Sequence, residues 1–119
     1  MIPVPNGTKI FLRPGKTDGR QGINTLAMLA EGTMKENPFS GNLFLFLNKR
    51  ERPLRGLYWD KNGFCLWMKR LEEERFHWPA SDQEMGAKEI SIKELQWILD
   101  GLRFGKLKPH KIRNYSTIL

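Results

Sequence analysis

The stretch from residue 43 to residue 78 constrains the fold most, because its side chains alternate with the period of two that is typical of β-strands. Its first segment, Leu43 to Lys49, places phenylalanines on one face and leucines on the other. A strand that is apolar on both faces lies inside a sheet that is covered from both sides. We therefore expect this segment to be a central strand.

A β-hairpin follows in the same stretch. The segments 54–59 and 64–71 flank Asp60-Lys61-Asn62-Gly63, and Asn-Gly is a residue pair that tolerates the positive φ angles of a tight turn. The segment 75–78 then alternates basic with aromatic side chains. Together with 43–49, these segments predict a four-strand antiparallel meander.

The alternation within 64–71 does not decide whether both sides of the sheet are buried, because both faces of this strand are largely apolar. Either the sheet is covered by other elements on both sides, or one side is a docking surface for a partner. The loops and strand ends of the meander are rich in lysine and arginine, which is also usual for a solvated rim.

One strand and one helix are expected before the meander. Residues 8–13 lie between two glycine-containing turns, and their side chains alternate with the period of a strand. They predict a strand at an edge of the sheet. Residues 20–33 have apolar side chains three and four apart, the spacing of a helix that packs on a sheet, with Asp18 or Thr17 as the N-cap. The turn Gly19-Arg20-Gln21-Gly22 fits the short GxxG pattern of one class of RNA-binding loop, but a plain capped turn is the better interpretation.

A second helix is expected after the polar connector 80–90. Ser91 and Glu94 have the spacing of a capping box, and Gly101 stands where a helix over 92–100 would end. The elements together predict an α+β fold. It consists of a small, mostly antiparallel sheet, the four-strand meander plus an N-terminal strand, packed with two helices and followed by a basic C-terminal tail.

The net charge of +7 is unevenly placed along the chain. Residues 103–119 contain five basic residues and no acidic one, and their apolar residues have too little periodicity to predict an element. We interpret 1–102 as a single domain and 103–119 as a mobile, basic arm. Such an arm neutralises phosphates without defined geometry, which favours a polyanionic partner, although solubility explains the charge almost as well.

Cysteine content and hydropathy indicate the environment of the protein. The single cysteine, Cys65, excludes an internal disulfide, and one cysteine with two histidines is too few for the usual zinc cage. The first residues lack a basic region followed by an apolar stretch, and no apolar run approaches the ~20 residues of a membrane helix. We expect a soluble, cytoplasmic protein with no membrane partner.

The sequence lacks the common catalytic motifs GxSxG, the Walker loop and HExxH. Neither histidine has a partner at a spacing that indicates nucleophilic catalysis. Asp18, Asp60 and Asp100 are explained as helix-cap, turn and helix-end residues, so no carboxylate cluster for two metal ions is apparent. We therefore expect no enzymatic activity, no cofactor and no metal site.

Three linked blocks of the sequence carry a resemblance: PFSG at 38–41, WDKNG at 59–63 and KRLE at 69–72, with TDGRQGINTLAML upstream. The chain closely resembles the TnpB-type accessory protein of the insertion-sequence sixty-six family of bacterial transposable elements, which is unrelated to the RNA-guided nuclease of the same name. The likeness covers roughly residues 1–102 and leaves the tail outside. Gly19 and Gln21 depart from the family pattern, which has a larger apolar residue and a basic residue there.

The resemblance implies a small protein that is encoded beside a separate carboxylate-triad transposase and assists transposition with no catalytic centre of its own. Two hypotheses follow. In the first, the protein binds DNA, at element ends or without specificity, and helps to assemble the transposase; the basic charge favours this. In the second, it is an adaptor that binds the transposase without contacting DNA; the apolar sheet and its tryptophans favour this.

The candidate DNA-binding residues fall into two groups. Those of the domain gather because the strands 43–49 and 64–71 flank the same middle strand and run parallel to each other, although charge pairing with neighbouring glutamates explains them equally well. Those of the tail are the basic residues after residue 102. The full set is Asn48, Arg50, Arg52, Lys69, Arg70, Arg103, Lys106, Lys108, Lys111 and Arg113. The candidate residues for binding a protein partner are Trp59, Trp67 and Trp97.

Overall fold

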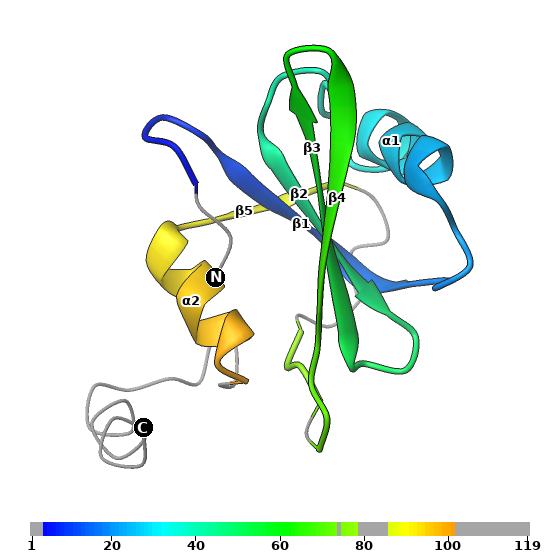
Figure 1. Cartoon of the computed structure of the whole chain (residues 1–119), viewed down its shortest axis with the longest axis vertical. Helices are drawn as coiled ribbons and strands as arrows, with labels where there is room; N and C mark the ends of the chain where they lie inside the picture. The colour runs from blue at the N-terminus through cyan, green and yellow to red at the C-terminus, as the bar shows by residue number, and fades with distance from the viewer. Residues whose placement is uncertain (1–3, 74, 79–85, 102–119) are drawn as a thin grey trace.

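The structure is a computed structural model, and it describes residues 4–73, 75–78 and 86–101. In chain order the elements (Figure 1) are β1 (Ile10–Thr17), α1 (Ile23–Gly32), β2 (Leu43–Asn48), β3 (Pro53–Asp60), β4 (Gly63–Arg70), β5 (Lys88–Ile90) and α2 (Ile92–Leu99). The five strands form one sheet in the order β4-β3-β2-β1-β5. Strands β1 and β2 are parallel, and the other three neighbouring pairs are antiparallel, which confirms the mostly antiparallel α+β fold.

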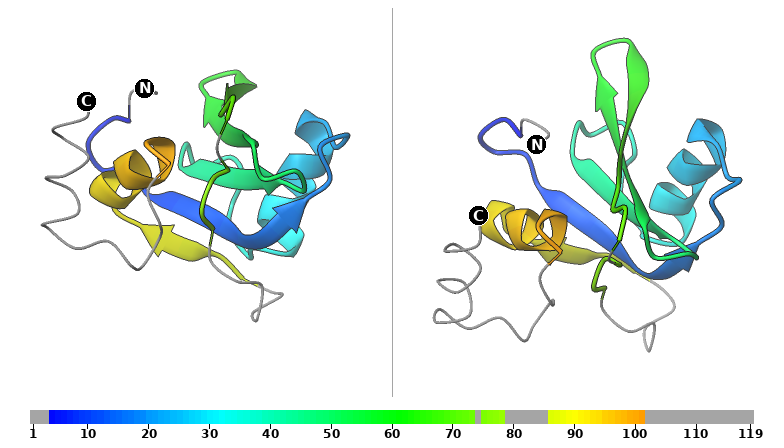
Figure 2. Two further views of the ribbon diagram at one scale, coloured as in Figure 1. Left: turned by 90° about the horizontal axis from the view of Figure 1, so that it is seen from below. Right: turned by 60° about the horizontal axis from the view of Figure 1, so that its bottom comes forward.

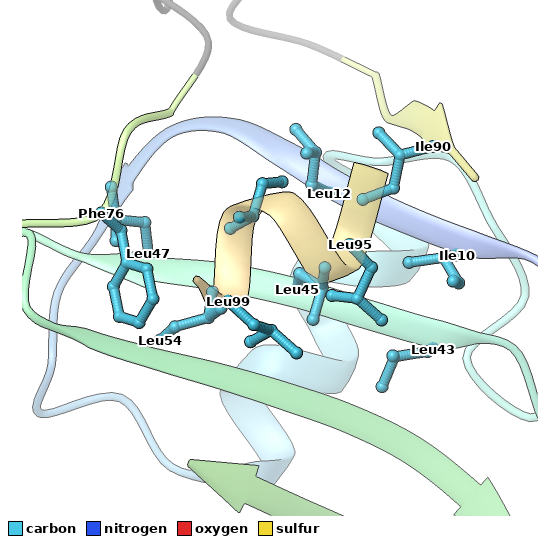
Figure 3. Packing of buried hydrophobic residues seen from close by; sticks show 11 residues of the cluster. Ile10, Leu12, Leu43, Leu45, Leu47, Leu54, Phe76, Ile90, Leu95 and Leu99 are labelled. Carbon is cyan, nitrogen blue, oxygen red and sulfur yellow. The ribbon is translucent and has the colours of Figure 1, made fainter. Parts of the chain in front are cut away.

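The two helices lie on opposite sides of the sheet (Figure 2), and the alternating side chains of β2 contribute to a separate hydrophobic core on each side. Full burial of one leucine or phenylalanine side chain stabilises the fold by about 1.5–3 kcal/mol. The sheet is therefore covered on both sides around β1 and β2, the first of the two open interpretations. The α2 side holds Leu43, Leu45, Leu47, Leu95, Ile98 and Leu99 (Figure 3), and the α1 side holds Phe44, Phe46, Leu26 and Ala30.

The hairpin and the second helix are confirmed. Asp60 pairs with Gly63 across a two-residue turn, although Lys61 rather than the Asn-Gly pair adopts the positive φ angle, at 53°. At the start of α2, the Ser91 hydroxyl accepts a hydrogen bond from the Glu94 amide at 3.1 Å, and the Glu94 carboxylate accepts one from the Ser91 amide at 2.9 Å. This capping box satisfies amide groups that the helix itself leaves without partners.

The expected fourth strand of the meander is wrong, because residues 75–78 form no strand. This segment crosses the α2-side core: Phe76 is 1% exposed, and its amide donates to the Glu51 carbonyl oxygen at 2.7 Å. The Trp78 indole donates to the Arg13 carbonyl oxygen at 2.7 Å. The alternation of aromatic and polar residues here reflects burial against the core rather than pairing in a sheet.

The N-terminal strand was expected at an edge, and this is wrong because β5 pairs with its outer side. The three residues of β5 lie within 80–90, so the prediction of a polar connector there is wrong for these residues. Strand β1 also continues through Pro14-Gly15 instead of ending there. The pairing with β2 shifts between Leu12 and Lys16, so the proline, which has no amide hydrogen to donate, falls in a bulge.

The first helix is shorter than predicted and is capped differently. It runs over Ile23–Gly32, and its N-cap residue is Gly22, with no side-chain hydrogen bond. Asp18 instead accepts a hydrogen bond from the Arg20 amide at 2.9 Å and so fixes the loop before the helix. Within the described part of the chain, neither helix is long and apolar enough to cross a membrane.

Candidate nucleic-acid interface

The turn between β2 and β3 carries the most basic stretch of the described chain, and Asn48 shapes it. The Asn48 side-chain oxygen accepts a hydrogen bond from the Arg50 amide at 2.9 Å, and its backbone carbonyl accepts one from the Glu51 amide at 2.8 Å. Glu51 takes a positive φ angle of 65° to close the turn. As a result the side chains of Lys49 and Arg50 are exposed.

The loop before α1 lies against this turn. Gly19 is in such close contact with Asn48 that a Cβ atom at position 19 would lie 1.8 Å from Asn48 Nδ2. Any larger residue at position 19 would therefore displace the Asn48 side chain. Arg20 is held over the loop by Asp18, with 3.0 Å between Nη2 and Oδ2.

Arg55 of β3 fixes the same loop to the sheet through hydrogen bonds to its backbone. Its side chain is 6% exposed and donates hydrogen bonds to the backbone carbonyl oxygens of Gln21 and Asp18, the latter at 3.1 Å. A guanidinium group presents donors in a rigid fork, so one side chain reaches two carbonyl groups of the loop. The buried cation fixes the position of Gly19 and Arg20 relative to the sheet.

The end of β4 completes the arrangement. Arg70 stands opposite Pro53 in the sheet and forms an ion pair with Glu72 at 3.1 Å. Arg52 donates to the Glu72 carbonyl oxygen at 3.3 Å. Across the turn, the carboxylate of Glu51 pairs with Lys16 at 3.2 Å and with Arg75 at 3.6 Å.

These segments enclose two adjacent depressions of about 520 and 430 Å³, which share Lys49, Arg50 and Pro53. We call this surface the basic end. Six cationic side chains line it against three carboxylates, and within the described residues Lys49 and Arg50 make no side-chain hydrogen bond or ion pair. The cations are Arg20, Lys49, Arg50, Arg52, Arg70 and Arg75, and the carboxylates are Asp18, Glu51 and Glu72.

The sequence model of one protein family, described as "IS66 Orf2 like protein", matches residues 8–109. This chain belongs to the IS66 Orf2-like family. The match extends beyond residue 102, so the first part of the predicted tail lies within the family region rather than outside it. Membership associates the protein with IS66 transposition as an accessory protein.

Two relatives come from Sinorhizobium fredii (strain NBRC 101917 / NGR234). "Uncharacterized protein y4hO" is 36% identical over 102 residues, which is 86% of this chain and 87% of the relative. "Uncharacterized protein y4jC" is 31% identical over 118 residues, 99% of each chain. No solved structure matches the chain significantly.

Four of the candidate DNA-binding residues of this IS66 Orf2-like protein come together at the basic end: Asn48, Arg50, Arg52 and Arg70. Lys69 does not join them, because its ammonium group points to the opposite face of the sheet and donates to the Leu99 carbonyl oxygen at 2.7 Å. Arg103, Lys106, Lys108, Lys111 and Arg113 lie outside the described residues.

Sequence reasoning left three cations of the basic end off the candidate set: Arg20, Lys49 and Arg75. The sequence favours a plain capped turn around Arg20 and a solvated rim for Lys49 and Arg75. No local sequence signal points to Arg20 and Lys49, because their proximity depends on the contact between Gly19 and Asn48, two residues that are distant in the sequence. The position of Arg75 at the basic end could not be predicted, because it depends on the departure of residues 75–78 from the sheet.

The ion pairs of the basic end shift the pKa values of its acids. The hydrogen bonds from the side chain and amide of Arg20 lower the pKa of Asp18 from 3.8 to about 2. The hydrogen bond from Arg70 likewise lowers the pKa of Glu72, and Glu72 in turn raises the pKa of Arg70. Both carboxylates are therefore ionised at neutral pH and offset part of the positive charge.

The three candidate tryptophans occupy different environments. Trp67 packs partly buried against the α2-side core, and Trp97 is half-buried with Lys93 Nζ 5.6 Å from its ring centroid. Trp59 belongs to an aromatic cluster with Phe39 and Phe64, at centroid distances of 5.1 and 5.0 Å. Phe39, which the candidate set omitted, is 56% exposed. No group of three or more metal-ligating side chains occurs among the described residues.

Proposed function

We propose that this protein is a non-catalytic accessory factor that helps a separately encoded transposase to assemble on element DNA, and that it binds the DNA backbone through the basic end. The observation that carries the proposal is the twofold excess of cations over carboxylates around two adjoining depressions. Arginine supports backbone binding because its fork of donors matches the geometry of a phosphate.

The cations of the basic end can bind phosphate groups with little loss of internal ion pairs. Lys49 and Arg50 make no ion pair within the described residues, so they lose no internal partner when a phosphate arrives. The side chains of Arg70 and Arg75 are 61% and 67% exposed, and exposed ion pairs contribute only about 0–1 kcal/mol. Arg70 and Arg75 can therefore turn from Glu72 and Glu51 to a phosphate at little cost.

The test is the salt dependence of binding to element-end and random duplexes. Each phosphate contact contributes about −0.9 to the slope of log K against log salt, so Lys49→Gln/Arg50→Gln should flatten the slope by up to roughly 2 on both duplexes. Lys9→Gln is the matched control, because Lys9 is exposed and precedes the first residue of β1, at the end of that strand away from the basic end. Equal slopes for the wild type and the double variant would contradict the proposal.

A second candidate function, an adaptor that binds the transposase without DNA, is favoured by the aromatic cluster around Phe39. Phe39 lies in the turn before β2 and packs against Trp59 of β3 and Phe64 of β4. Exposed aromatic side chains are frequent anchors of protein interfaces, and truncation of a central one often costs about 2 kcal/mol or more of binding energy. The variant Phe39→Ala should then weaken a measured complex with the transposase at least tenfold. An unchanged affinity of the folded variant would exclude this surface.

The non-catalytic part of the proposal rests on the distribution of acids in the domain. Asp18 pairs with Arg20, and Asp60 lies in the hairpin at the other end of β3, so these carboxylates do not converge on a common metal position. Purified protein should neither cut nor join DNA with magnesium or manganese present. Metal-dependent nicking that disappears on Asp18→Asn or Asp60→Asn would contradict this.

A further inference from the structure

The outer edge of β4 is an unpaired strand edge in the described chain. β4 stands at one end of the strand order and pairs only with β3. It is eight residues long, whereas β5 at the other edge has three residues. A long edge strand presents a row of free amide and carbonyl groups, and these can pair with another strand.

The composition of this edge does not protect it. From Gly63 to Met68 the strand contains no charge and no proline, the usual devices that prevent edge pairing. Two of its apolar side chains, Leu66 and Met68, are 39% and 61% exposed on the α1 side of the sheet. This edge is apolar although the whole chain carries a net charge of +7.

We propose that β4 pairs antiparallel with β4 of a second copy of this chain, about a twofold axis at Leu66. The two five-stranded sheets then form one continuous sheet of two protomers. A twofold interface needs a surface that complements itself, because the same residues meet on both sides of the axis.

The sequence of β4 meets this requirement in the register centred on Leu66. Leu66 faces Leu66 of the other copy, Phe64 faces Met68, and Cys65 faces Trp67, so every central pair is apolar. The cations also avoid each other: Lys69 faces Gly63, and Arg70 faces Asn62. Like charges placed directly opposite would be destabilising, and this register contains none. The self-complementary pattern is the reason for choosing a second copy over an unrelated protein.

The dimer has a consequence for DNA binding, and this consequence alone rests on the proposed function. In the register centred on Leu66, eight residues separate the two Arg70 positions along the strands, or about 27 Å at about 3.4 Å per residue. The basic ends extend outward from Arg70, so their spacing approaches the roughly 34 Å of one turn of B-DNA. Two copies could then contact the same face of one duplex.

Disulfide trapping without DNA tests the pairing and its register. In a Cys65→Ala background, Leu66→Cys would place two thiols directly opposite, with Cβ atoms about 4.5–5.5 Å apart, close to the separation that a disulfide requires. Met68→Cys is the matched control: Met68 is more exposed than Leu66, yet its two copies would lie roughly 14 Å apart along the strands. Oxidation should trap a dimer of the first variant much faster than of the second.

Sedimentation equilibrium provides a second measurement on the unmodified chain. Because one strand pair makes a small interface, we expect a weak dimer with a dissociation constant on the order of micromolar to tens of micromolar. Leu66→Lys would place two lysines opposite each other and should sediment as a folded monomer. A wild-type monomer at hundreds of micromolar, or equal trapping of the two cysteine variants, would overturn the proposal. These outcomes are independent of whether the basic end binds DNA.

Discussion

The Asn48 side chain packs directly against Gly19, and a Cβ atom at position 19 would lie 1.8 Å from Asn48 Nδ2, which leaves no room for a methyl group. This contact joins the turn after β2 to the loop before α1, two segments that both contribute cations to the basic end. The Asn48 side chain is not free to rotate away without loss, because its oxygen accepts the hydrogen bond from the Arg50 amide.

The contact predicts that Gly19→Ala destabilises the protein by about 1–2 kcal/mol, the range of a lost hydrogen bond with local strain. Gly32→Ala is the matched control, because a Cβ atom there meets nothing within 4 Å and φ is not positive, so it should stabilise α1 by roughly 0.5–1 kcal/mol. Urea unfolding of both variants measures the difference. If Gly19→Ala proves neutral, Asn48 is more adaptable than its hydrogen bond indicates.

A pH dependence follows from the pairing of Asp18 with Arg20. The pKa of Asp18 is about 2 in the folded protein against an ordinary value of 3.8, so the folded state favours the ionised form. This contribution to the free energy of unfolding is present above about pH 4 and is lost as the pH falls through about 2. Unfolding measured between pH 2 and 5 should therefore show a smaller acid-induced loss in Asp18→Asn than in the wild type. Glu72, whose pKa Arg70 also lowers, would supply a remaining loss in the variant.

Lys69 and Arg70 are neighbours with opposite expected roles. Lys69 satisfies a carbonyl oxygen at the end of α2, where a cation also interacts favourably with the helix dipole, so Lys69→Met should cost about 1–3 kcal/mol of stability. The DNA affinity of the folded variant should be unchanged. Arg70→Gln should show the reverse, with stability within about 0.5 kcal/mol of the wild type and weaker duplex binding. Equal loss of DNA affinity in both variants would contradict this assignment.

The basic residues after position 102 predict a separate, sequence-independent contribution to DNA binding. Removal of 103–119 takes away five basic residues and should flatten the salt dependence by up to roughly 4 units at about 0.9 per phosphate. The chain ending at Leu102 should keep the part of the slope that Lys49→Gln/Arg50→Gln removes. An unchanged slope after truncation would show that these residues serve solubility alone.

The sequence predicted α2 and β2 correctly, because both are determined by residues that are close together in the chain. The capping box at Ser91 and Glu94 placed α2 within one residue, and the alternation of Leu43 to Leu47 predicted a central strand with two apolar faces. Both depend on residues within a few positions of each other.

Features that depend on distant residues were missed. The three residues of β5 are too short and too polar to show a period, and they become a strand only because β1 offers an edge. Phe76 was assigned to a strand because burial in the core gives the same alternation as a sheet. At the basic end, Arg50 and Arg70 could be predicted from the shared middle strand. The alternation along β4 already places Lys69 on the face opposite to Arg70, and only its hydrogen bond to the Leu99 carbonyl oxygen depends on the position of α2.

The central position of β1 has a consequence for the chain as it leaves the ribosome. Ile10 is paired with Leu43 on one side and with Ile90 on the other, so its second neighbour is synthesised eighty residues later. Until then the edge of β1 that β5 covers has no partner, and contacts of such long sequence separation also form slowly. The nascent chain therefore passes through a period in which an apolar edge near its N-terminus is open to other chains, and this period ends with the synthesis of β5 and α2.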